Sequence, residues 1–528
     1  MKRWNGWGNI ATDYPVPPAA LAYLTAHLGE LAPQPDARLE DVVRAVPPTR
    51  LPAGPQFDTD PETRLRYARG QSLPDWVALR SGRIEAFPDA VARPTSAEEI
   101  RAALAFARTL GAGVIPYGGG TSVVGHINPP VSAAPVLTLS LERLNRVLEI
   151  DETSRLATVE AGAAGPHLEA QLQARGYTLG HYPQSFEYST LGGWIATRSS
   201  GQQSYHYGRI EALFAGGEVE TPRGSLRLPP FPASAAGPDL RELVLGSEGR
   251  LGVIVRAQVR VRPRPAAEGF YGIFFPSWDQ GVDATRAMVQ AGLAASMLRL
   301  SNPLETEVTL TLAGKRWIDW ADRGLRLIGF GAARCLLVFG ATGTAGHVRR
   351  TRGEAEALSR GFGGLPVGAT VGHTWQKSRF LSPYLRNTLW DRGVAVDTLE
   401  TALPWSRVKA AAEAVPQAIV RAAEAQGERV LAFAHLSHLY RDGASLYTTY
   451  LFRRAADPDE LLARWRAMKH AASLALQEHG GTITHQHGVG VDHALYLPAE
   501  KGALGLEALR AAIRVFDPDG QLNPGKLL

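Results

Sequence analysis

Three glycine-bearing stretches in the first half of the chain constrain its fold more than any other feature. They read PYGGGTSVVGH (116–126), YSTLGGWIATRSSGQQSYHYG (188–208) and GSEGRLGVI (246–254). Glycine lets the backbone approach a phosphate closely and turn its N–H groups toward an anion. The first stretch follows a short buried strand, AGVIPY, as a phosphate-binding loop does. Together the three stretches predict that the front half encloses a large, phosphate-bearing cofactor.

The same glycine pattern excludes two common nucleotide-binding folds. The run Gly118–Gly119–Gly120 does not fit G-x-G-x-x-G, and no amphipathic helix follows it, so it is not a Rossmann fingerprint. The chain contains no G-x-x-x-x-G-K-[ST], which excludes a P-loop NTPase. The cofactor must therefore be held by a different arrangement of loops.

The chain of 528 residues exceeds one ordinary hydrophobic core and predicts two or three domains. Residues 94–111 predict a helix in which Ser96 is the N-cap and Glu99 completes a capping box. Strand-like alternation up to residue 263 gives way to apolar strands that alternate with helices, so we expect an α+β fold. The expected parts are a leader packed on the body (1–85), a cofactor-binding domain (86–265), an α/β substrate cap (266–500) and a C-terminal segment returning to the cofactor site (501–528).

Composition narrows the class of protein further. The formal net charge of +5 is spread along the chain without a Lys/Arg-rich run, which disfavours a nucleic-acid partner. The single cysteine, Cys335, excludes an internal disulfide and disfavours a cysteine-based metal site. The start lacks a secretory h-region, and no segment is long and apolar enough to span a membrane. We expect a cytoplasmic protein, and leave open peripheral membrane contact and a homodimer.

The glycine-bearing stretches also carry a resemblance to a known family. PYGGGTSVVG, HYPQSFEYSTLGGWIATRSSGQQSYHYGRIE and LVLGSEGRLGVI resemble the FAD-binding segments of the vanillyl-alcohol oxidase/p-cresol methylhydroxylase flavoproteins. WNGWG, FPDAVARPTS, RNTLWDRGVAVDTLETALPW and GGTITHQHGVG narrow the resemblance to the alkyldihydroxyacetonephosphate synthase family, in order from end to end. The resemblance implies a two-subdomain FAD-binding domain of the p-cresol methylhydroxylase type at 86–265, followed by the substrate cap.

The cofactor implied by this resemblance is FAD, held without a covalent bond. The only cysteine lies outside the FAD segments, and His126 is a weak candidate for a covalent anchor. The implied contacts are with the pyrophosphate in the first stretch, the flavin and ribityl chain in the second, and the adenine side in the third. The residues implied are Pro116, Tyr117, Gly118, Gly119, Gly120, Thr121, Ser122, Gln184, Ser185, Ser189, Thr190, Thr197, Arg198, Ser199, Ser200, Glu248, Gly249, Leu251, Gly252, Val253 and Ile254.

The resemblance also implies substrate-binding and catalytic residues in the second half. Arg386 would bind the substrate, because a guanidinium forms a planar, permanently charged fork for a phosphate or carboxylate. Arg299 corresponds to a second functional arginine, and Tyr447 to the catalytic base. From the residues alone, an arginine is usually a surface residue and a strand tyrosine usually packs. A phenol is also a poor base unless nearby positive charge, from Arg386 or a protonated histidine, stabilises the phenolate.

Two late histidines, His485 and His487, stand one residue apart in GGTITHQHGVG. In an extended segment, residues i and i+2 face the same way, which predicts a two-imidazole face with Gln486 pointing away. A metal site, structural histidines, and an acid–base or anion-binding pair beside the flavin are all consistent with the spacing; we favour the last and expect no metal, because the sequence shows no partner cluster. Alkyldihydroxyacetonephosphate synthases carry three consecutive histidines here, so Gln486 is a departure.

Three classes of function follow. The resemblance implies an FAD-dependent transferase that exchanges the acyl group of acyl-dihydroxyacetonephosphate for a fatty alcohol, without net redox change. The alternative is an FAD-linked dehydrogenase or oxidase of a 2-hydroxy acid, in which the same arginine binds a carboxylate. The third class is a flavin- or metal-binding module without turnover. In either enzyme the substrate is a small or lipid-like anion.

Overall fold

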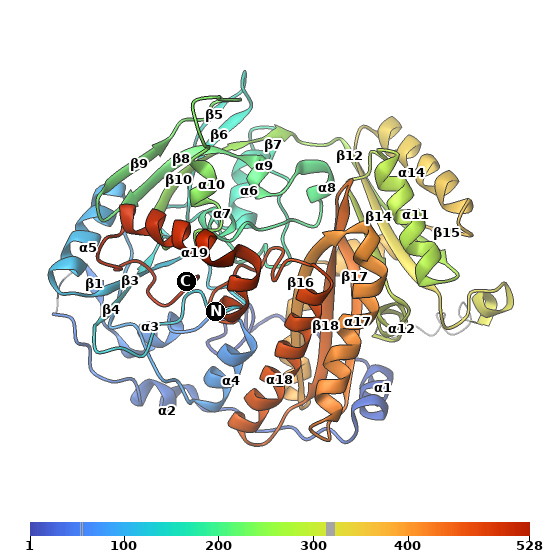
Figure 1. Cartoon of the computed structure of the whole chain (residues 1–528), viewed down its shortest axis with the longest axis horizontal. Coiled ribbons are helices and arrows are strands. Elements are labelled where there is room, and N and C mark those ends of the chain that lie inside the picture. Colours follow the sequence, from blue (N-terminus) through green and yellow to red (C-terminus); the bar gives the residue numbers. More distant parts are fainter. Residues whose placement is uncertain (53, 55, 313–322) are drawn as a thin grey trace.

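The chain folds into two halves that lie side by side in the computed structural model, which describes residues 1–52, 54, 56–312 and 323–528 (Figure 1). The first half contains two larger sheets and a short two-stranded one, whereas the second is built on one large sheet. Both halves thus combine helices with mainly antiparallel sheets, which confirms the α+β expectation.

The first half combines a largely parallel sheet with an antiparallel one. The four-stranded sheet has the order β1-β2-β4-β3, in which β2, β4 and β3 are parallel and β1 is antiparallel. The antiparallel sheet has the order β5-β6-β10-β8-β9, and β11 pairs with β7. The strands are β1 (Phe57–Asp58), β2 (Ala90–Ala92), β3 (Gly113–Tyr117), β4 (Val136–Ser140), β5 (Val147–Asp151), β6 (Leu156–Glu160), β7 (Tyr177–Thr178), β8 (Phe214–Thr221), β9 (Gly224–Leu228), β10 (Val253–Arg260) and β11 (Arg262–Pro263).

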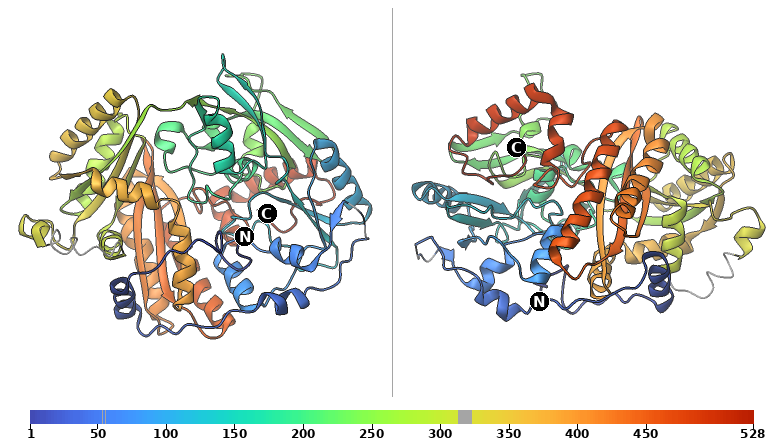
Figure 2. Two further views of the ribbon diagram at one scale, coloured as in Figure 1. Left: turned by 180° about the vertical axis from the view of Figure 1, so that it is seen from behind. Right: turned by 60° about the horizontal axis from the view of Figure 1, so that its bottom comes forward.

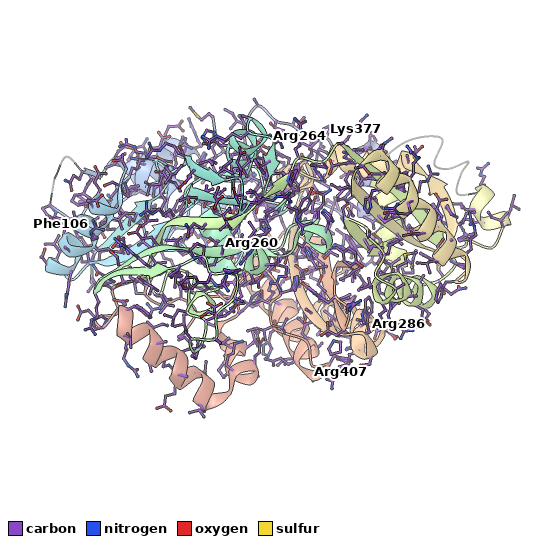
Figure 3. All side chains as sticks on the ribbon, turned by 90° about the horizontal axis from the view of Figure 1, so that it is seen from above. Phe106, Arg260, Arg264, Arg286, Lys377 and Arg407 are labelled. Atoms are coloured by element: carbon purple, nitrogen blue, oxygen red, sulfur yellow. The ribbon has the colours of Figure 1, made fainter. Side chains whose placement is uncertain are left out.

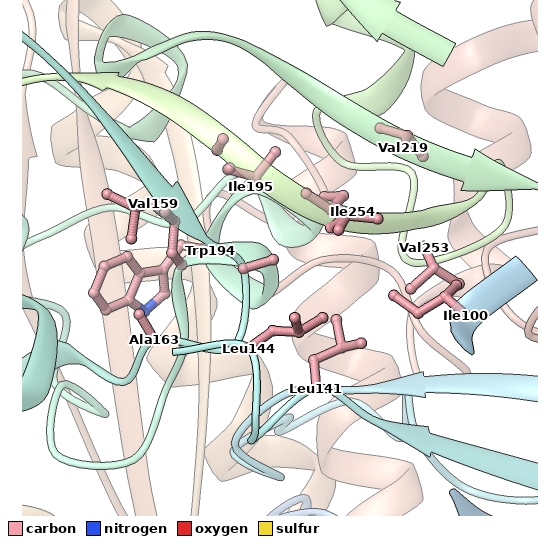
Figure 4. Packing of buried hydrophobic residues seen from close by; sticks show 14 of the residues in the cluster. Ile100, Leu141, Leu144, Val159, Ala163, Trp194, Ile195, Val219, Val253 and Ile254 are labelled. Carbon is pink, nitrogen blue, oxygen red and sulfur yellow. The ribbon is translucent and has the colours of Figure 1, made fainter. Parts of the chain in front are cut away.

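One hydrophobic core joins the two larger sheets of this half. Figure 4 shows Ile100 beside Val253, and Leu141 and Leu144 beneath the strand that carries Ile254. All of these side chains are almost completely buried, so the two sheets cannot separate without exposing the core. The helices of this half are α5 (Ala97–Thr109), α6 (Gly165–Gln173), α7 (Leu191–Thr197), α8 (Ser204–Tyr207), α9 (Ile210–Leu213) and α10 (Arg241–Val244).

The second half is built on a seven-stranded antiparallel sheet with the order β15-β12-β14-β13-β17-β18-β16. Its strands are β12 (Ala267–Phe275), β13 (Met297–Ser301), β14 (Cys335–Gly343), β15 (Leu365–Gly368), β16 (Val394–Pro404), β17 (Val430–Leu439) and β18 (Gly443–Arg453). Its helices are α11 (Trp278–Gln290), α12 (Pro303–Leu312), α14 (Ala345–Arg360), α15 (Ala369–Ser378), α16 (Ser382–Asp391), α17 (Trp405–Glu424) and α18 (Pro458–Glu478).

The two faces of the large sheet have different environments. Along β17, Ala434 and Leu436 pack in one core with residues of α11 and α17. Phe433, His435 and Ser437 point to the opposite face, because successive side chains of a strand alternate. That opposite face lines a cavity between the two halves of the chain. Because side chains alternate along β17, polar and aromatic side chains face the cavity, and the side chains on the other face pack in the core.

Both ends of the chain pack against the two halves. Near the amino end, α1 (Pro18–Leu28) lies at the far end of the seven-stranded sheet, where Leu24 and Leu28 share a core with Phe433 (Figure 2). Near the carboxyl end, Leu522 bridges Val114 of β3. The remaining helical elements are α2 (Leu39–Arg44), α3 (Pro61–Arg66), α4 (Leu73–Ser81), η1 (Ala494–Tyr496) and α19 (Leu497–Phe516).

The surface is charged and mixed in sign. Seen from above, the labelled cations Arg260, Arg264, Arg286, Lys377 and Arg407 are spread across both halves (Figure 3). Within the described residues, no helix combines the length and the apolar character that crossing a bilayer requires.

Candidate active site

A cavity of about 560 Å³ lies between the two halves. Its lining comes from all three glycine-bearing stretches, from strands β16, β17 and β18, and from helices α15 and α16. The amino-terminal segment contributes Trp7 and Leu24, and the carboxyl-terminal segment contributes Asn523. Segments far apart in sequence therefore meet at one site.

The glycines of the first stretch are required by close packing of the first stretch against the second. A Cβ atom on Gly119 would stand 1.8 Å from the carbonyl oxygen of Tyr188, and one on Gly118 would stand 2.4 Å from Thr190 Oγ1. Gly120 has a φ of +73°, which L-residues rarely adopt. Glycine thus brings two loops together in a way that no residue with a side chain allows.

Most of the residues expected to bind the cofactor line this cavity. The expected residues in the lining are Pro116, Tyr117, Gly118, Gly119, Gly120, Thr121, Ser122, Gln184, Ser185, Ser189, Thr190, Thr197, Ser199, Ser200, Glu248, Gly249, Gly252 and Ile254. Hydroxyl groups and glycine backbone dominate this wall, which suits the phosphates and ribityl chain of a dinucleotide.

Three residues expected at the cofactor do not line the cavity. Arg198 ends α7 in the left-handed region and donates to Glu242 Oε2 at 2.6 Å, so its guanidinium turns outward. Leu251 and Val253 are buried, and Val253 faces the core between the sheets because strand alternation directs it away from Ile254. These side chains therefore lie outside the cavity lining, and contact of these residues with the cofactor stays a prediction.

Arg386 lies on α16 and lines the cavity as a cation with little compensation. Its guanidinium stands 4.3 Å from the centroid of the Trp76 ring, and Nη1 donates to the carbonyl of Gln71 at 2.5 Å. Nε and Nη2 are buried and have no hydrogen-bond partner in the described part of the chain. Burial lowers the pKa of Arg386 to about 10, so it remains charged at neutral pH. A buried, underpaired guanidinium is well suited to an anionic ligand.

Arg299 also lines the cavity, but its charge is already paired. Its Nη2 donates to Glu305 Oε1 at 2.7 Å and lies 3.2 Å from His435 Nδ1. Burial alone would raise the pKa of Glu305, yet His435 and Arg299 hold it at about 2. Arg299 therefore forms an ion pair with Glu305 that positions His435, and it is less available to a ligand than Arg386.

Tyr447 projects from β18 into the cavity between two histidines. Its ring stacks on His435 with centroids 5.0 Å apart and meets His487 edge-on at 5.7 Å, and its hydroxyl donates to Thr398 Oγ1 at 3.1 Å. Burial raises the pKa of Tyr447 above its usual range, and the lowering effect of Arg299 does not reverse this. In these surroundings Tyr447 is a neutral phenol, and its role as the base stays a prediction.

The expected face of two histidines is also wrong. Residues 480–490 form a loop, because Gly480, Gly488 and Gly490 take positive φ values of 67°, 80° and 54°. The cavity is lined by Gln486 and His487, whereas His485 lies behind them. Gln486 therefore faces the cavity instead of pointing away from it.

His487 and Gln486 present neutral groups to the cavity. Burial lowers the pKa of His487 to about 4, which leaves a neutral imidazole at physiological pH. Gln486 accepts from the backbone N–H of Ser200 at 3.2 Å and donates to Glu400 Oε2 at 2.6 Å. Gln486 thus connects the second glycine-bearing stretch to strand β16.

Several residues of this site were not predicted from the sequence. Glu400 and His438 lie beside His485, with His485 Nδ1 3.1 Å from Glu400 Oε1 and the rings of His485 and His438 stacked at 5.0 Å. The ligand atoms of these three residues lie within 4.8 Å of one another, so the partner cluster that the sequence did not show does exist. Arg379, on the cavity wall, was missed as well. The alternation in VLAFAHLSHL could have indicated His435 and Ser437 as one face.

Comparison with known proteins identifies the class of this site. Residues 88–228 match the family described as "FAD binding domain", and residues 264–527 match the one described as "FAD linked oxidases, C-terminal domain". The chain belongs to the FAD-linked oxidases, and FAD is its cofactor.

Within that family, the chain is similar to alkyldihydroxyacetonephosphate synthases. It is 31% identical to the one from Dictyostelium discoideum, over 90% of this chain and 78% of the relative, and 29% identical to the one from Trypanosoma brucei brucei, over 100% and 92%. A solved alkyldihydroxyacetonephosphate synthase superposes with a TM-score of 0.86 at 27% identity, covering 100% of this chain and 99% of that one.

Two further relatives help to define the fold and the range of similarity. Solved p-cresol methylhydroxylase superposes with a TM-score of 0.68 at 14% identity, covering 96% of each chain, so the two share a fold. The glycolate oxidase subunit GlcD of Bacillus subtilis is 27% identical over 90% of this chain and 94% of the relative.

Proposed function

We propose that the chain is an alkyldihydroxyacetonephosphate synthase, an FAD-dependent transferase that replaces the acyl group of acyl-dihydroxyacetonephosphate with a fatty alcohol. The observation that carries this proposal is the pairing of an anion site with an extended apolar wall in one cavity. Arg386 supplies the anion site. The apolar wall belongs to a single hydrophobic cluster and consists of Leu24, Val308, Leu385, Leu389, Val396, Phe433 and Leu451.

This pairing fits a substrate with a phosphate at one end and a long hydrocarbon chain at the other. Burying each methylene group on such a wall contributes about 0.8 kcal/mol to binding. A short 2-hydroxy acid has no chain to place there. Arg386 alone would suit either substrate, and the similarity to a glycolate oxidase subunit keeps a hydroxy-acid dehydrogenase as the second candidate.

The side chains around Tyr447 supply the proton-handling groups of the reaction. FAD, when bound, supplies an electron sink to the substrate carbon. Arg386 orients the substrate through its phosphate, and His487, a neutral imidazole, accepts a proton at a ring nitrogen. Tyr447, a neutral phenol in the unliganded cavity, donates a hydrogen bond toward the reacting oxygen. The apolar wall orders the chain and excludes water.

The reaction is tested by separate additions to the purified yellow protein. With acyl-dihydroxyacetonephosphate and a long-chain alcohol, we expect the ether product and free fatty acid by mass spectrometry, with no electron acceptor consumed. Bleaching of the flavin by a hydroxy acid, without ether formation, would favour the second candidate. A yellow protein unaffected by either would indicate a flavin-binding module without turnover.

The role of Tyr447 is tested by Tyr447→Phe, which keeps the ring and its stacking on His435. We expect the ether-forming rate to fall about 100-fold or more while the FAD content is unchanged. An unaffected rate would remove Tyr447 from the mechanism. Tyr271→Phe, on a strand outside the cavity lining, is the matched control.

We also propose that the four-part division at residues 85, 265 and 500 describes the domains.

We further propose that FAD is held without a covalent bond. Cys335 is buried in the core of the seven-stranded sheet, away from the cavity lining. His126 lines the cavity, but its Nδ1 lies 2.8 Å from Ser122 Oγ and its Nε2 lies 3.2 Å from Glu248. Acid precipitation should therefore release all of the flavin into the supernatant.

A further inference from the structure

A chain of polar groups runs from the cavity to a second cleft at the end of β17. Ser437, in the cavity lining, donates to Glu400 Oε1 at 3.3 Å. Glu400 Oε1 stands 3.1 Å from His485 Nδ1, and His485 Nε2 stands 2.6 Å from the hydroxyl of Tyr440. Tyr440 lines the second cleft. The contacts of Ser437 with Glu400 and of His485 with Tyr440 are hydrogen bonds, whereas Glu400 and His485 Nδ1 form a close ion-pair contact without a hydrogen bond in the described part of the chain.

The second cleft is an open, water-accessible space of about 670 Å³. It lies between α8 and α9 on one side and the end of β17 on the other, and its lining includes Arg209, Glu211 and Arg441. Glu400 and His485 are buried, whereas Tyr440 is half-buried. The polar chain thus begins at the cavity, passes through the interior, and ends beside solvent.

The proposed reaction requires such a route, and the inference rests on that proposed function. The alcohol loses its O–H proton as its oxygen forms the ether bond, and the ester C–O bond breaks with its electron pair leaving on the carboxylate. Near neutral pH the fatty acid stays ionised, because carboxyl groups ionise near pH 4 to 5. One proton per turnover must therefore reach solvent from the cavity, and it cannot leave along the apolar wall that would hold the hydrocarbon chain.

We propose that Ser437, Glu400, His485 and Tyr440 form the path by which this proton leaves the cavity for the second cleft. An imidazole can take up a proton at one ring nitrogen and release another from the second. His485 has one ring nitrogen beside Glu400 and the other beside Tyr440, so it connects the two halves of the path. His485 acts here as a relay behind the cavity wall, whereas His487 meets the substrate.

The electrostatic surroundings keep the path charged at its centre. Burial alone would raise the pKa of Glu400, but His485 and His438 hold it below its usual range, so the carboxylate is ionised. The groups that face His485 are Glu400 from β16, His438 from β17, Tyr440 directly after β17, and Arg209, whose Nη2 donates to the carbonyl of His485 at 2.9 Å.

A metal ion bound by Glu400, His438 and His485 is the competing explanation for this cluster. Their ligand atoms are close enough, lying within 4.8 Å of one another. The two imidazole rings, however, are stacked with 26° between their planes. Ring-nitrogen lone pairs lie in the ring plane, so those of stacked rings do not converge on one ion. The geometry favours the proton path.

The test uses Tyr440→Phe in the full-length, FAD-loaded protein, which removes only the outer hydroxyl of the path. Proton release is followed in weakly buffered solution with a pH indicator after addition of acyl-dihydroxyacetonephosphate and a long-chain alcohol. We expect release to slow about tenfold or more, and added imidazole to restore it. Tyr205→Phe, which changes the other tyrosine of the same cleft, should leave release unaffected.

A second measurement does not depend on turnover. In the flavin-free protein, nitrogen NMR of labelled histidine reports how fast the ring N–H of His485 exchanges with water. We expect Tyr440→Phe to slow this exchange and Tyr205→Phe to leave it unchanged. If no ether forms but exchange slows, the proposed function fails and the path stands. Unchanged exchange and unchanged proton release in Tyr440→Phe, or one tightly bound metal ion per chain that His438→Ala abolishes, would overturn the path.

Discussion

At the scale of single residues, the site is defined by buried groups that lack a partner. Within the described residues, two guanidinium nitrogens of Arg386 have no hydrogen-bond partner, whereas Nη2 of Arg299, also in the cavity lining, donates to Glu305. A buried polar group left unpaired costs about 1–3 kcal/mol, and more when it is charged. Arg386 is therefore maintained at the expense of stability, as expected for a group that a ligand completes.

We predict that Arg386→Ala raises the KM for acyl-dihydroxyacetonephosphate about 30-fold or more, because a charge-assisted hydrogen bond contributes about 2–3 kcal/mol. The flavin content should not change, since Arg386 is contributed by α16 and not by the glycine-bearing stretches. Steady-state kinetics on the two proteins measure the effect. Arg264→Ala, an exposed arginine, is the control. A KM unchanged in Arg386→Ala would exclude this residue from substrate binding.

At the scale of elements, the glycine-bearing loops are held by backbone contact. We predict that Gly119→Ala lowers the FAD content of the purified protein by at least about tenfold, because a methyl group 1.8 Å from the Tyr188 carbonyl must displace one of the two loops. Flavin absorbance per chain measures this. Gly353→Ala is the matched control, because it lies on α14 with open space around it and should be neutral or stabilising. Full FAD content in Gly119→Ala would contradict the packing argument.

Several elements could be predicted from local sequence. The helix expected at 94–111 is α5, with Ser96 accepting from the N–H of Glu99. The carboxylate of Glu99 returns to Thr95 and not to Ser96, so the capping box is displaced by one residue. The alternating run that ends near residue 263 is β10 followed by β11. Period and capping are local properties, and for this reason they can be predicted from the sequence.

The centre of the site could not be predicted in this way, because it depends on strand register. Tyr447 pairs with Glu400 across β16 and with His435 across β17. These pairings join residues that are far apart in sequence, and a shift of one position would turn each side chain to the other face. The shared face predicted for His485 and His487 was wrong for a related reason. The glycines of residues 480–490 take positive φ values, so side chains there do not alternate as they do in a strand.

At the scale of the whole molecule, buried neutral histidines make stability depend on pH. Burial lowers the pKa of His181, His438 and His493 to about 3 and that of His487 to about 4. An unfolded histidine ionises near pH 6.5, so between that pH and about 4 the unfolded chain binds more protons than the folded one. These groups therefore contribute stability above pH 6.5 that is lost as the pH falls toward 4.

We predict that the urea midpoint of the flavin-free protein is lower at pH 5 than at pH 7.5. Asp492, Glu169 and Asp517 act in the opposite direction, because burial raises the pKa of each carboxyl group, that of Asp492 to about 7, but the four histidines outnumber them. His487→Gln should reduce the difference between the two midpoints. A midpoint that is equal or higher at pH 5 would contradict the assignment of neutral buried histidines.

The contact between the first residues and α16 has a consequence for biosynthesis. The backbone of Trp7 exchanges two hydrogen bonds with Asn387, next to Arg386, and the carbonyl of Asn5 accepts from Arg80. Trp7 must therefore remain available for a partner that is translated 380 positions later. At about 5–20 residues per second, this wait lasts roughly 20–80 s. The Arg386 end of the cavity consequently cannot be completed before that interval has passed, and chaperones that shield an exposed tryptophan would act during it.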